Sequence, residues 1–460
     1  MYTVHIGRRF LELYNARMGC EKTPLEFYNE VYWPLFFNCA DEKQMQQVHG
    51  SWFFQPDIAK KNAKTPHLIP GIRKDSFLKA VTGCSQGNEP VTGGIAVGFM
   101  STEESTTSGQ VTDVDQRPTL DDSLCSWFGA GLGIGFGGGV DFLAEDEDLI
   151  WYIYEGWRFY RKYLTDTNNL KGRQIETWNG LWILLGLAHR RDIETAYNRV
   201  TQSIGAHSSE AAGVQKLNRP EWHKQLLAMA RELGGRGKML HYGYSYGSMN
   251  KTYGFLYFDL PKVRTLPQLY DQLLAEYSTD YDRKETPFEE VYRTQYSLER
   301  AVQTGGVGLR ALTPKDLYKY MGGRPDLPKI DEKNIHTFFT YLTWIEAMLD
   351  NPQTLALADE LATALKVFAT SAKNPNERAG STARANKVDK LWEAKSRTAF
   401  INELDELLQD KQPADPDVLN KAVETVMLHI PGDQFSLFHT LVKFRYHFLS
   451  AKNNQTLFQS

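Results

Sequence analysis

The chain of 460 residues is poor in cysteine and has no long apolar run. Its four cysteines lie far apart and form no C-x-x-C pair: Cys20, Cys39, Cys84 and Cys125. This spacing argues against a zinc ribbon and favours a reducing compartment. No apolar run reaches the roughly 20 residues that a membrane span needs, and residues 1–10 lack the apolar core of a secretory signal. We therefore expect a soluble, cytoplasmic protein.

Catalytic signatures are also scarce. The sequence has no H-E-x-x-H pattern and no Cys/His pair at metal-ligand spacing, and its 11 histidines are scattered singly. Fragments of a magnesium-nuclease pattern, Pro56-Asp57 and Glu393-Ala394-Lys395, lie far apart in the chain. Because no set of catalytic residue types converges, we expect a binding or scaffolding protein with no catalytic residue, no metal and no cofactor.

The overall charge gives little sign of a nucleic-acid partner. There are 52 Lys+Arg against 56 Asp+Glu, so any phosphate-binding surface must be concentrated in local patches. Aromatic residues make up 12% of the chain, which indicates large packed interfaces or surfaces on which bases stack.

The most unusual stretch is residues 128–143, FGAGLGIGFGGGVDFL, in which glycine alternates with apolar residues. Glycine at alternate positions removes a row of side chains and lets another backbone approach closely. Gly133, Gly135 and Gly138 also satisfy G-x-G-x-x-G, but the strand-to-helix context of a nucleotide site is missing. We expect a close-packed structural segment or a loop that approaches a large ligand. The acidic cluster at 141–148 predicts the first turn of the next helix, with a metal site as the alternative.

A basic run follows the aromatic residues 52–54. Residues 50–88 contain six cations and two anions, a local charge of +4, with prolines that predict a loop. The run is either a solvated loop or a phosphate-contacting loop, and its candidate DNA-binding residues are Lys60, Lys61, Lys64, Arg73, Lys74 and Lys79.

Polar loops extend over residues 81–122 and are rich in Gly, Ser, Thr, Gln and Asn. Amide side chains can pair with adenine edges, although they also form turns. The candidates for reading a DNA motif are Gln86, Asn88, Ser108 and Gln110. A second candidate is the tyrosine-rich stretch 240–260, which predicts short strands or an ordered loop.

The fold class expected is α+β: an irregular, loop-rich mixed body over residues 1–328 and an all-α bundle over residues 329–460. Residues 1–6 alternate like a short strand, and residues 10–18 predict a helix. Thr23-Pro24-Leu25-Glu26 predicts a helix start with a capping box. Glycines and prolines at 322–328 mark the boundary, beyond which we expect helices at 332–349, 352–368, 382–408, 415–428 and 433–449.

One helix of the bundle is basic. A solvated helix face is the favoured interpretation, and the alternative is a phosphate-binding surface. The candidate phosphate contacts are Arg384, Lys387, Lys390, Lys395 and Arg397.

The chain resembles the large subunit of a type I CRISPR effector complex (Cascade) of the I-B kind, including those associated with transposons. The resemblance is carried by HIGRRFLELYN (5–15), EVYWPLFFN (30–38), the segment TTSGQVTD…WFGAGLGIGFGGG (106–139), the Gly/Pro boundary and the separate helical bundle. It covers the whole chain in outline.

The resemblance implies a subunit that does not cut DNA but recognises the protospacer-adjacent motif, helps to open the duplex and guides the displaced strand. The implied partners are guide RNA, target DNA and the backbone, guide-end-capping and small subunits of the complex. It also implies that an internal start, here Met321, yields the helical bundle as a separate small subunit.

Two other functions remain open at this stage. One is a sequence-specific, magnesium-dependent DNA endonuclease, and the other is a protein-binding scaffold without nucleic-acid contact. Salt-dependent DNA binding separates the scaffold from the other two, and metal-dependent cleavage separates the endonuclease.

Overall fold

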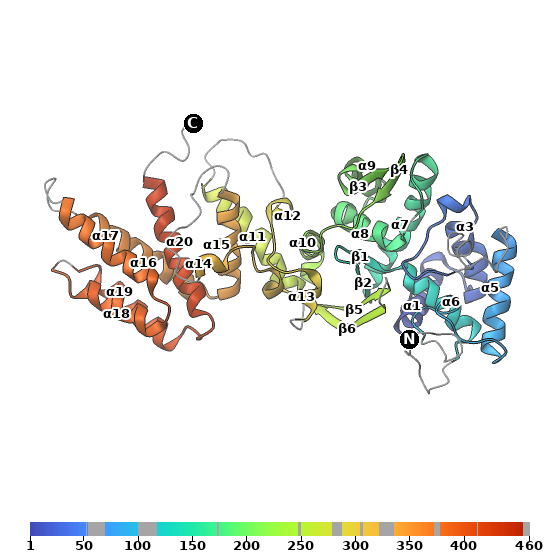
Figure 1. Ribbon diagram of the computed structural model, residues 1–460, viewed down its shortest axis with the longest axis horizontal. Coiled ribbons are helices and arrows are strands. Elements are labelled where there is room, and N and C mark those ends of the chain that lie inside the picture. The colour runs from blue at the N-terminus through green and yellow to red at the C-terminus, as the bar shows by residue number, and fades with distance from the viewer. Residues whose placement is uncertain are drawn as a thin grey trace. The chain divides into compact units, whose positions relative to one another are not determined.

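The computed structural model describes residues 1–51, 53, 70–99, 117–172, 174–246, 250–277, 288–303, 307–321, 335–371, 378–411 and 413–453 (Figure 1). The chain forms two compact units. The first comprises Met1–Pro261 and Leu298–Val307, and the second comprises Lys262–Ser297 and Gly308–Ser460. The expected α+β class is confirmed.

The first unit is mixed. Its helices are α1 (Tyr2–Met18), α2 (Pro24–Phe27), α3 (Trp33–Phe36), α5 (Pro70–Ser85), α6 (Leu120–Gly131), α7 (Glu147–Asp166), α8 (Ile175–Gly186), α9 (Ile193–Ser203), α10 (Trp222–Leu233) and α13 (Leu298–Gln303). A π-helical turn at Tyr28–Tyr32 joins α2 to α3, and 3-10 turns lie at Asp41–Lys43, Leu187–His189, Ile204–His207 and Gly234–Arg236.

The main sheet is antiparallel, with strand order β1-β2-β5-β6. It contains β1 (Ile134–Phe136), β2 (Val140–Ala144), β5 (Met239–Tyr246) and β6 (Asn250–Phe258), and a separate hairpin contains β3 (Ser208–Ala211) and β4 (Val214–Leu217). The tyrosine-rich stretch therefore forms two strands, as expected. Since β6 ends the strand order, it is an edge strand.

Two local predictions for the first unit are wrong. Residues 2–6 belong to α1 and not to a strand, because Thr3, Gly7 and Phe10 continue one buried stripe at helical spacing. Residues 70–85 form α5 and not a loop. The capping box at Thr23 is confirmed: Thr23 Oγ1 accepts a hydrogen bond from Glu26 N at 3.2 Å, and the Glu26 carboxylate accepts one from Thr23 N at 2.8 Å.

Helices α1 and α6 cross with their backbones in contact. A Cβ atom on Gly7 would lie 1.9 Å from Cys125 O, and one on Gly129 would lie 2.0 Å from Thr3 O. The close approach predicted for the glycine segment is therefore confirmed at Gly129, and α6 includes the first two alternating glycines and ends at Gly131.

The second unit is helical over the residues described. It contains α11 (Leu260–Tyr277, which begins at the end of the first unit), α12 (Phe288–Val291), a 3-10 turn at Leu309–Leu312, α14 (Tyr318–Met321), α15 (Ile335–Leu349), α16 (Pro352–Thr370), α17 (Arg378–Glu393), α18 (Arg397–Leu408), α19 (Pro416–Leu428) and α20 (Phe435–Asn453). The single helix expected at 382–408 is two helices, because Ser396 caps a new helix by accepting a hydrogen bond from Ala399 N.

The division between the units does not coincide with the boundary expected at residue 328. Residues 262–297 and 308–321 belong with the bundle because α15 binds them directly. Trp344 Nε1 donates to Leu309 O at 2.8 Å, and the Tyr341 hydroxyl donates to Lys315 O at 2.8 Å. Both are hydrogen bonds from large, nearly buried side chains. The Gly/Pro sequence at 322–334 itself lies outside the described residues.

No helix in the described ranges is long and apolar enough to cross a membrane.

Candidate nucleic-acid interface

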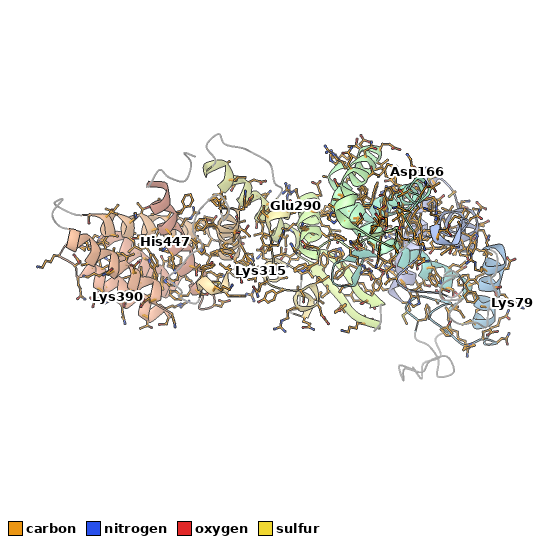
Figure 2. All side chains as sticks on the ribbon, turned by 45° about the horizontal axis from the view of Figure 1, so that its top comes forward. Lys79, Asp166, Glu290, Lys315, Lys390 and His447 are labelled. Atoms are coloured by element: carbon orange, nitrogen blue, oxygen red, sulfur yellow. The ribbon has the colours of Figure 1, made fainter. Side chains whose placement is uncertain are left out.

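The basic run of residues 60–79 is only partly described. Lys60, Lys61 and Lys64 lie outside the described residues. Arg73 is 5% exposed, so its side chain belongs to the interior of the unit and not to an open phosphate-binding loop. Lys74 is half-buried and Lys79 is exposed on α5 (Figure 2). In this region, Lys74 and Lys79 therefore remain as candidate contacts.

Two of the four motif-reading candidates follow α5 directly. Gln86 and Asn88 are both exposed, and Asn88 Nδ2 donates to Gln86 Oε1 at 3.3 Å. Their amide groups therefore lie at the surface on one short turn, held by Asn88 N donating to Gly83 O at 2.8 Å. Ser108 and Gln110 lie outside the described residues.

Three of the five basic candidates in the bundle form ion pairs or hydrogen bonds with other residues of the second unit. Lys387 Nζ pairs with Asp410 Oδ2 at 2.8 Å, and Arg384 Nε lies 3.7 Å from Asp410 Oδ1. Arg384 also donates to Ser371 O, and Arg397 donates to Ile430 O. These side chains connect α17 and α18 to their neighbours, which the sequence prediction had not anticipated.

Lys390 and Lys395 differ from these three cations. Both are exposed, Lys390 on the last turn of α17 (Figure 2) and Lys395 between α17 and α18. Neither forms an ion pair with another residue of the described ranges. Their charge is therefore available to a partner of opposite sign.

The glycine segment does not form a phosphate cradle. The chain order is helix, glycines, strand, which is the reverse of a nucleotide-binding turn. The space beside the first two glycines of the pattern is occupied: a Cβ atom on Gly133 would lie 2.3 Å from the Tyr244 hydroxyl, and one on Gly135 would lie 2.7 Å from Glu176 O. A Cβ atom on the third, Gly138, would make only an ordinary contact, with Leu298 Cβ at 3.7 Å. The close-packed structural alternative is the one that the structure supports.

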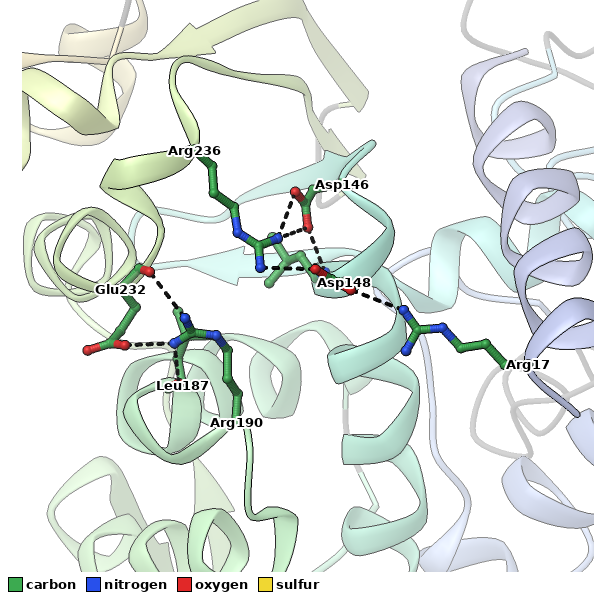
Figure 3. Close-up of polar contacts among 8 residues, drawn as sticks. Arg17, Asp146, Asp148, Leu187, Arg190, Glu232 and Arg236 are labelled. Carbon is green, nitrogen blue, oxygen red and sulfur yellow. Dashed lines mark hydrogen bonds and ion pairs between the residues drawn. The ribbon is translucent and has the colours of Figure 1, made fainter.

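The acidic cluster after the glycines caps and stabilises α7. Asp146 is the N-cap and accepts a hydrogen bond from Leu149 N at 2.9 Å. Figure 3 shows the Arg236 guanidinium bound to Asp146 and Asp148, and Arg17 bound to the other side of Asp148. Hydrogen bonds from these arginines hold the pKa of Asp148 below its usual value despite partial burial. No group of three or more His, Cys, Asp or Glu in the described ranges could hold a metal ion.

A pair of buried acidic side chains lies at the hairpin formed by β1 and β2. Asp141 and Glu176 are both 0% exposed. Arg219 Nη2 lies 2.9 Å from Asp141 Oδ1, and Val48 N donates to both carboxylate oxygens of Glu176, at 2.9 and 3.0 Å. Burial and the charge of Asp141 raise the pKa of Glu176 to about 8, while burial raises that of Asp141 to about 6 against the opposing effect of Arg219. Glu176 therefore takes up a proton at a higher pH than Asp141, whose carboxylate lies beside its arginine.

Two G-x-S-x-G sequences, at residues 83–87 and 243–247, were overlooked by the sequence reasoning. This pattern marks a nucleophilic serine only where it forms a sharp turn from a strand into a helix. Ser85 ends α5 and donates to Thr82 O at 2.9 Å, and Ser245 lies within β5 of an antiparallel hairpin. Neither serine occupies the turn that such an active site requires.

An exposed aromatic pair on β6 was also missed. Phe255 is 59% exposed and Tyr257 is 60% exposed, whereas Leu256 and Phe258 between and beyond them are buried. Residues 255–258 are all apolar or aromatic, so the sequence could not show which of them lie on the exposed face of the strand.

The candidate contacts of the first unit are therefore lysines on α5, the polar turn after it and an aromatic pair on β6, and those of the second unit are lysines at the end of α17 and just after it. No family model, curated protein or solved structure matches this chain.

Proposed function

We propose that this chain is the non-catalytic large subunit of a CRISPR RNA-guided DNA surveillance complex of the type I-B kind. In this role it recognises the protospacer-adjacent motif and aids duplex opening and R-loop stabilisation. Its partners are guide RNA, target DNA and the backbone, guide-end-capping and small subunits. Base pairing with the guide reads most of the target, so the protein needs to read only a short motif and the DNA backbone.

Two of the segments that carry the resemblance pack together with Phe128 of the third in the first unit, while residues 106–116 of the third lie outside the described residues. Residues 5–15 lie in α1, residues 30–38 extend through α3, and Phe128 lies in α6. The ring of Tyr32 lies 5.1 Å from that of Phe128, and Phe27 lies 5.5 Å from Phe10 and 4.9 Å from Phe128. The mixed first unit and helical second unit also agree with the two-part organisation that the resemblance implies.

The observation that carries the DNA-binding part of the proposal is the pattern of lysines. Lys79 and Lys390 lie exposed on a helix of each unit, with Lys74 and Lys395 nearby in sequence. Over the described part of the chain these four lysines form no ion pair, whereas Lys387 forms one with Asp410. Such cations bind phosphates without reading sequence.

The first test is DNA binding at a series of salt concentrations. The variants Lys74→Gln/Lys79→Gln and Lys390→Gln/Lys395→Gln should each bind DNA more weakly, about equally for all sequences. The magnitude of the salt slope should fall by about 1 for each phosphate that a lysine no longer neutralises. The matched control is Lys171→Gln/Lys216→Gln, which removes two exposed lysines elsewhere in the first unit. Affinities and slopes equal to those of the wild type in both test variants would refute the assignment of these surfaces.

The second test separates the proposal from the endonuclease alternative. Glu393 is exposed at the end of α17, and Asp57 lies outside the described residues. The purified chain should leave duplex and single-stranded DNA intact in Mg²⁺ or Mn²⁺. Cleavage that Glu393→Ala abolishes would favour the endonuclease.

The third test addresses assembly. The chain, co-expressed with the products of its neighbouring genes, should co-purify with a guide RNA and a backbone subunit. A chain that purifies alone from such a strain contradicts the proposed complex.

A further inference from the structure

The outer face of the β5–β6 hairpin carries two aromatic rings in contact with solvent. Phe255 and Tyr257 are 59% and 60% exposed, and in the described ranges Tyr318 is the one other aromatic side chain with comparable exposure, at 49%. Burial of a single such ring contributes substantially to folding, so two open rings on one strand indicate a surface that binds a ligand.

The two rings are on one face because strand residues alternate. Leu256 and Phe258 lie on the buried face of the sheet, where the ring of Phe258 lies 5.0 Å from that of Phe142. Phe255 and Tyr257 are therefore on the opposite face, about 7 Å apart along the strand. Among the described strands β6 pairs with β5 alone, and its outer edge forms a single bridge, from Phe258 to Val307, beyond the aromatic pair.

Neighbouring aromatic residues restrict the ring of Phe255. The ring of Tyr242, which pairs with Phe255 across the hairpin, lies 5.3 Å from it at 64°, and that of Tyr2 lies 5.0 Å from it at 87°. Tyr2 and Tyr242 also contact each other, at 4.9 Å. Since these contacts restrict the ring of Phe255 before any ligand binds, little conformational entropy remains to be lost on binding.

Cations lie at both ends of the aromatic pair. Lys251, near the start of β6, lies 3.1 Å from Glu299, and Lys238, which precedes β5 next to the end of β6, lies 3.6 Å from Asp259. Both lysines are substantially exposed. Exposed ion pairs of this kind are weak, so each ammonium group can exchange its carboxylate for a phosphate.

We propose that this hairpin face is a stacking platform for unpaired bases, on which two nucleotides of a single strand lie against Phe255 and Tyr257 with their phosphates near Lys251 and Lys238. The bases of a duplex are already stacked inside it, so flat side chains on a strand can take only bases that are unpaired. The inference rests on the proposed function and deepens it, since it names a single strand as the ligand of the first unit.

The test is fluorescence anisotropy of a labelled oligothymidylate and of a labelled blunt-ended duplex with the full-length chain. The variant Phe255→Leu/Tyr257→Leu keeps apolar side chains but removes the flat faces. It should bind the oligothymidylate roughly tenfold more weakly for each ring removed, with an unchanged salt slope, because no charge is removed. Its affinity for the duplex should equal that of the wild type.

Two controls define the result. The exchange variant Phe255→Tyr/Tyr257→Phe retains both rings and should bind like the wild type. The variant Tyr318→Leu removes the exposed ring of the second unit and should have no effect. Unfolding midpoints should stay close to that of the wild type for all variants, because the replaced side chains are largely exposed, and a small loss in the leucine variant would report the ring contacts of Phe255 with Tyr2 and Tyr242.

The inference is overturned if the leucine variant binds oligothymidylate as tightly as the wild type, or if the wild-type chain does not bind it. The proposed function fails separately: ring-dependent binding by a chain that assembles with no guide RNA supports the platform and contradicts the complex.

Discussion

The crossing of α1 and α6 allows a sharp prediction, because it depends on the absence of one side-chain atom. In Gly129→Ala, the new Cβ would lie 2.0 Å from Thr3 O, 2.9 Å from Thr3 C and 3.0 Å from Gly7 N. Ordinary van der Waals contact starts at 3.4 Å, so the helices must separate by more than about 1 Å. The obstructing atoms are backbone, and no rotamer change can relieve the clash.

The expected cost follows from two opposing effects. Overpacking of a close-packed interior costs roughly 1–3 kcal/mol, and a backbone clash belongs at the upper end of that range. Replacing glycine by alanine within a helix returns about 0.5–1 kcal/mol. The free energy of unfolding should therefore fall by about 2 kcal/mol, which corresponds to a Tm lower by about 4–8 °C for a unit of this size.

The assay is thermal and urea unfolding followed by circular dichroism, with Gly205→Ala as the matched control. A Cβ on Gly205 meets no heavy atom within 4 Å, so this variant should stay within about 0.5 kcal/mol of the wild type. Gly7→Ala should resemble Gly129→Ala, and the double variant should lose less than the sum, since both changes separate the same two helices. A Gly129→Ala protein as stable as the Gly205→Ala control would refute the reasoning.

Two further predictions concern pH and the limits of the second unit. The pKa of Glu176 is raised from 4.5 to about 8. Between these pH values the folded chain keeps a proton that the unfolded chain releases. The free energy of unfolding should therefore fall as the pH rises from about 4.5 to 8. Glu176→Gln should reduce this slope in urea unfolding at a series of pH values, and a slope equal to that of the wild type contradicts the assignment. A fragment beginning at Met321, the start expected for an internal product, lacks Leu309 and Lys315, which α15 binds. It should unfold at a lower temperature than the fragment that begins at Lys262, and equal stability would show that the bundle is complete without those residues.

Much of the helical architecture could be predicted because its signals are local. Thr23 and Glu26 form their capping box within one turn, and Asn351 caps α16 by accepting hydrogen bonds from Gln353 N and Thr354 N. Asp415 caps α19 in the same way. The position of these helix starts follows from residues that are neighbours in sequence, so no knowledge of the tertiary fold is needed. The alternating glycines likewise indicated a close backbone approach, though not the partner.

Long-range contacts decided the rest. Residues 2–6 lie in the helix that packs Thr3 against Gly129 of a distant segment, a contact that the alternating pattern of the first six residues does not show. The same limitation applies to the candidate site. Sequence charge alone could not separate Lys387, which pairs with Asp410, from Lys390, which is exposed.

The aromatic surface shows the clearest division between sequence and tertiary structure. The aromatic residues of 250–258 favoured short strands or an ordered loop, and the structure forms β6 there, since aromatic residues suit a pleated backbone. The sequence by itself left undetermined which rings would be covered. Register and neighbours buried Phe258 against Phe142 and left Phe255 and Tyr257 open, because a strand has two equivalent faces until the rest of the chain packs against one of them.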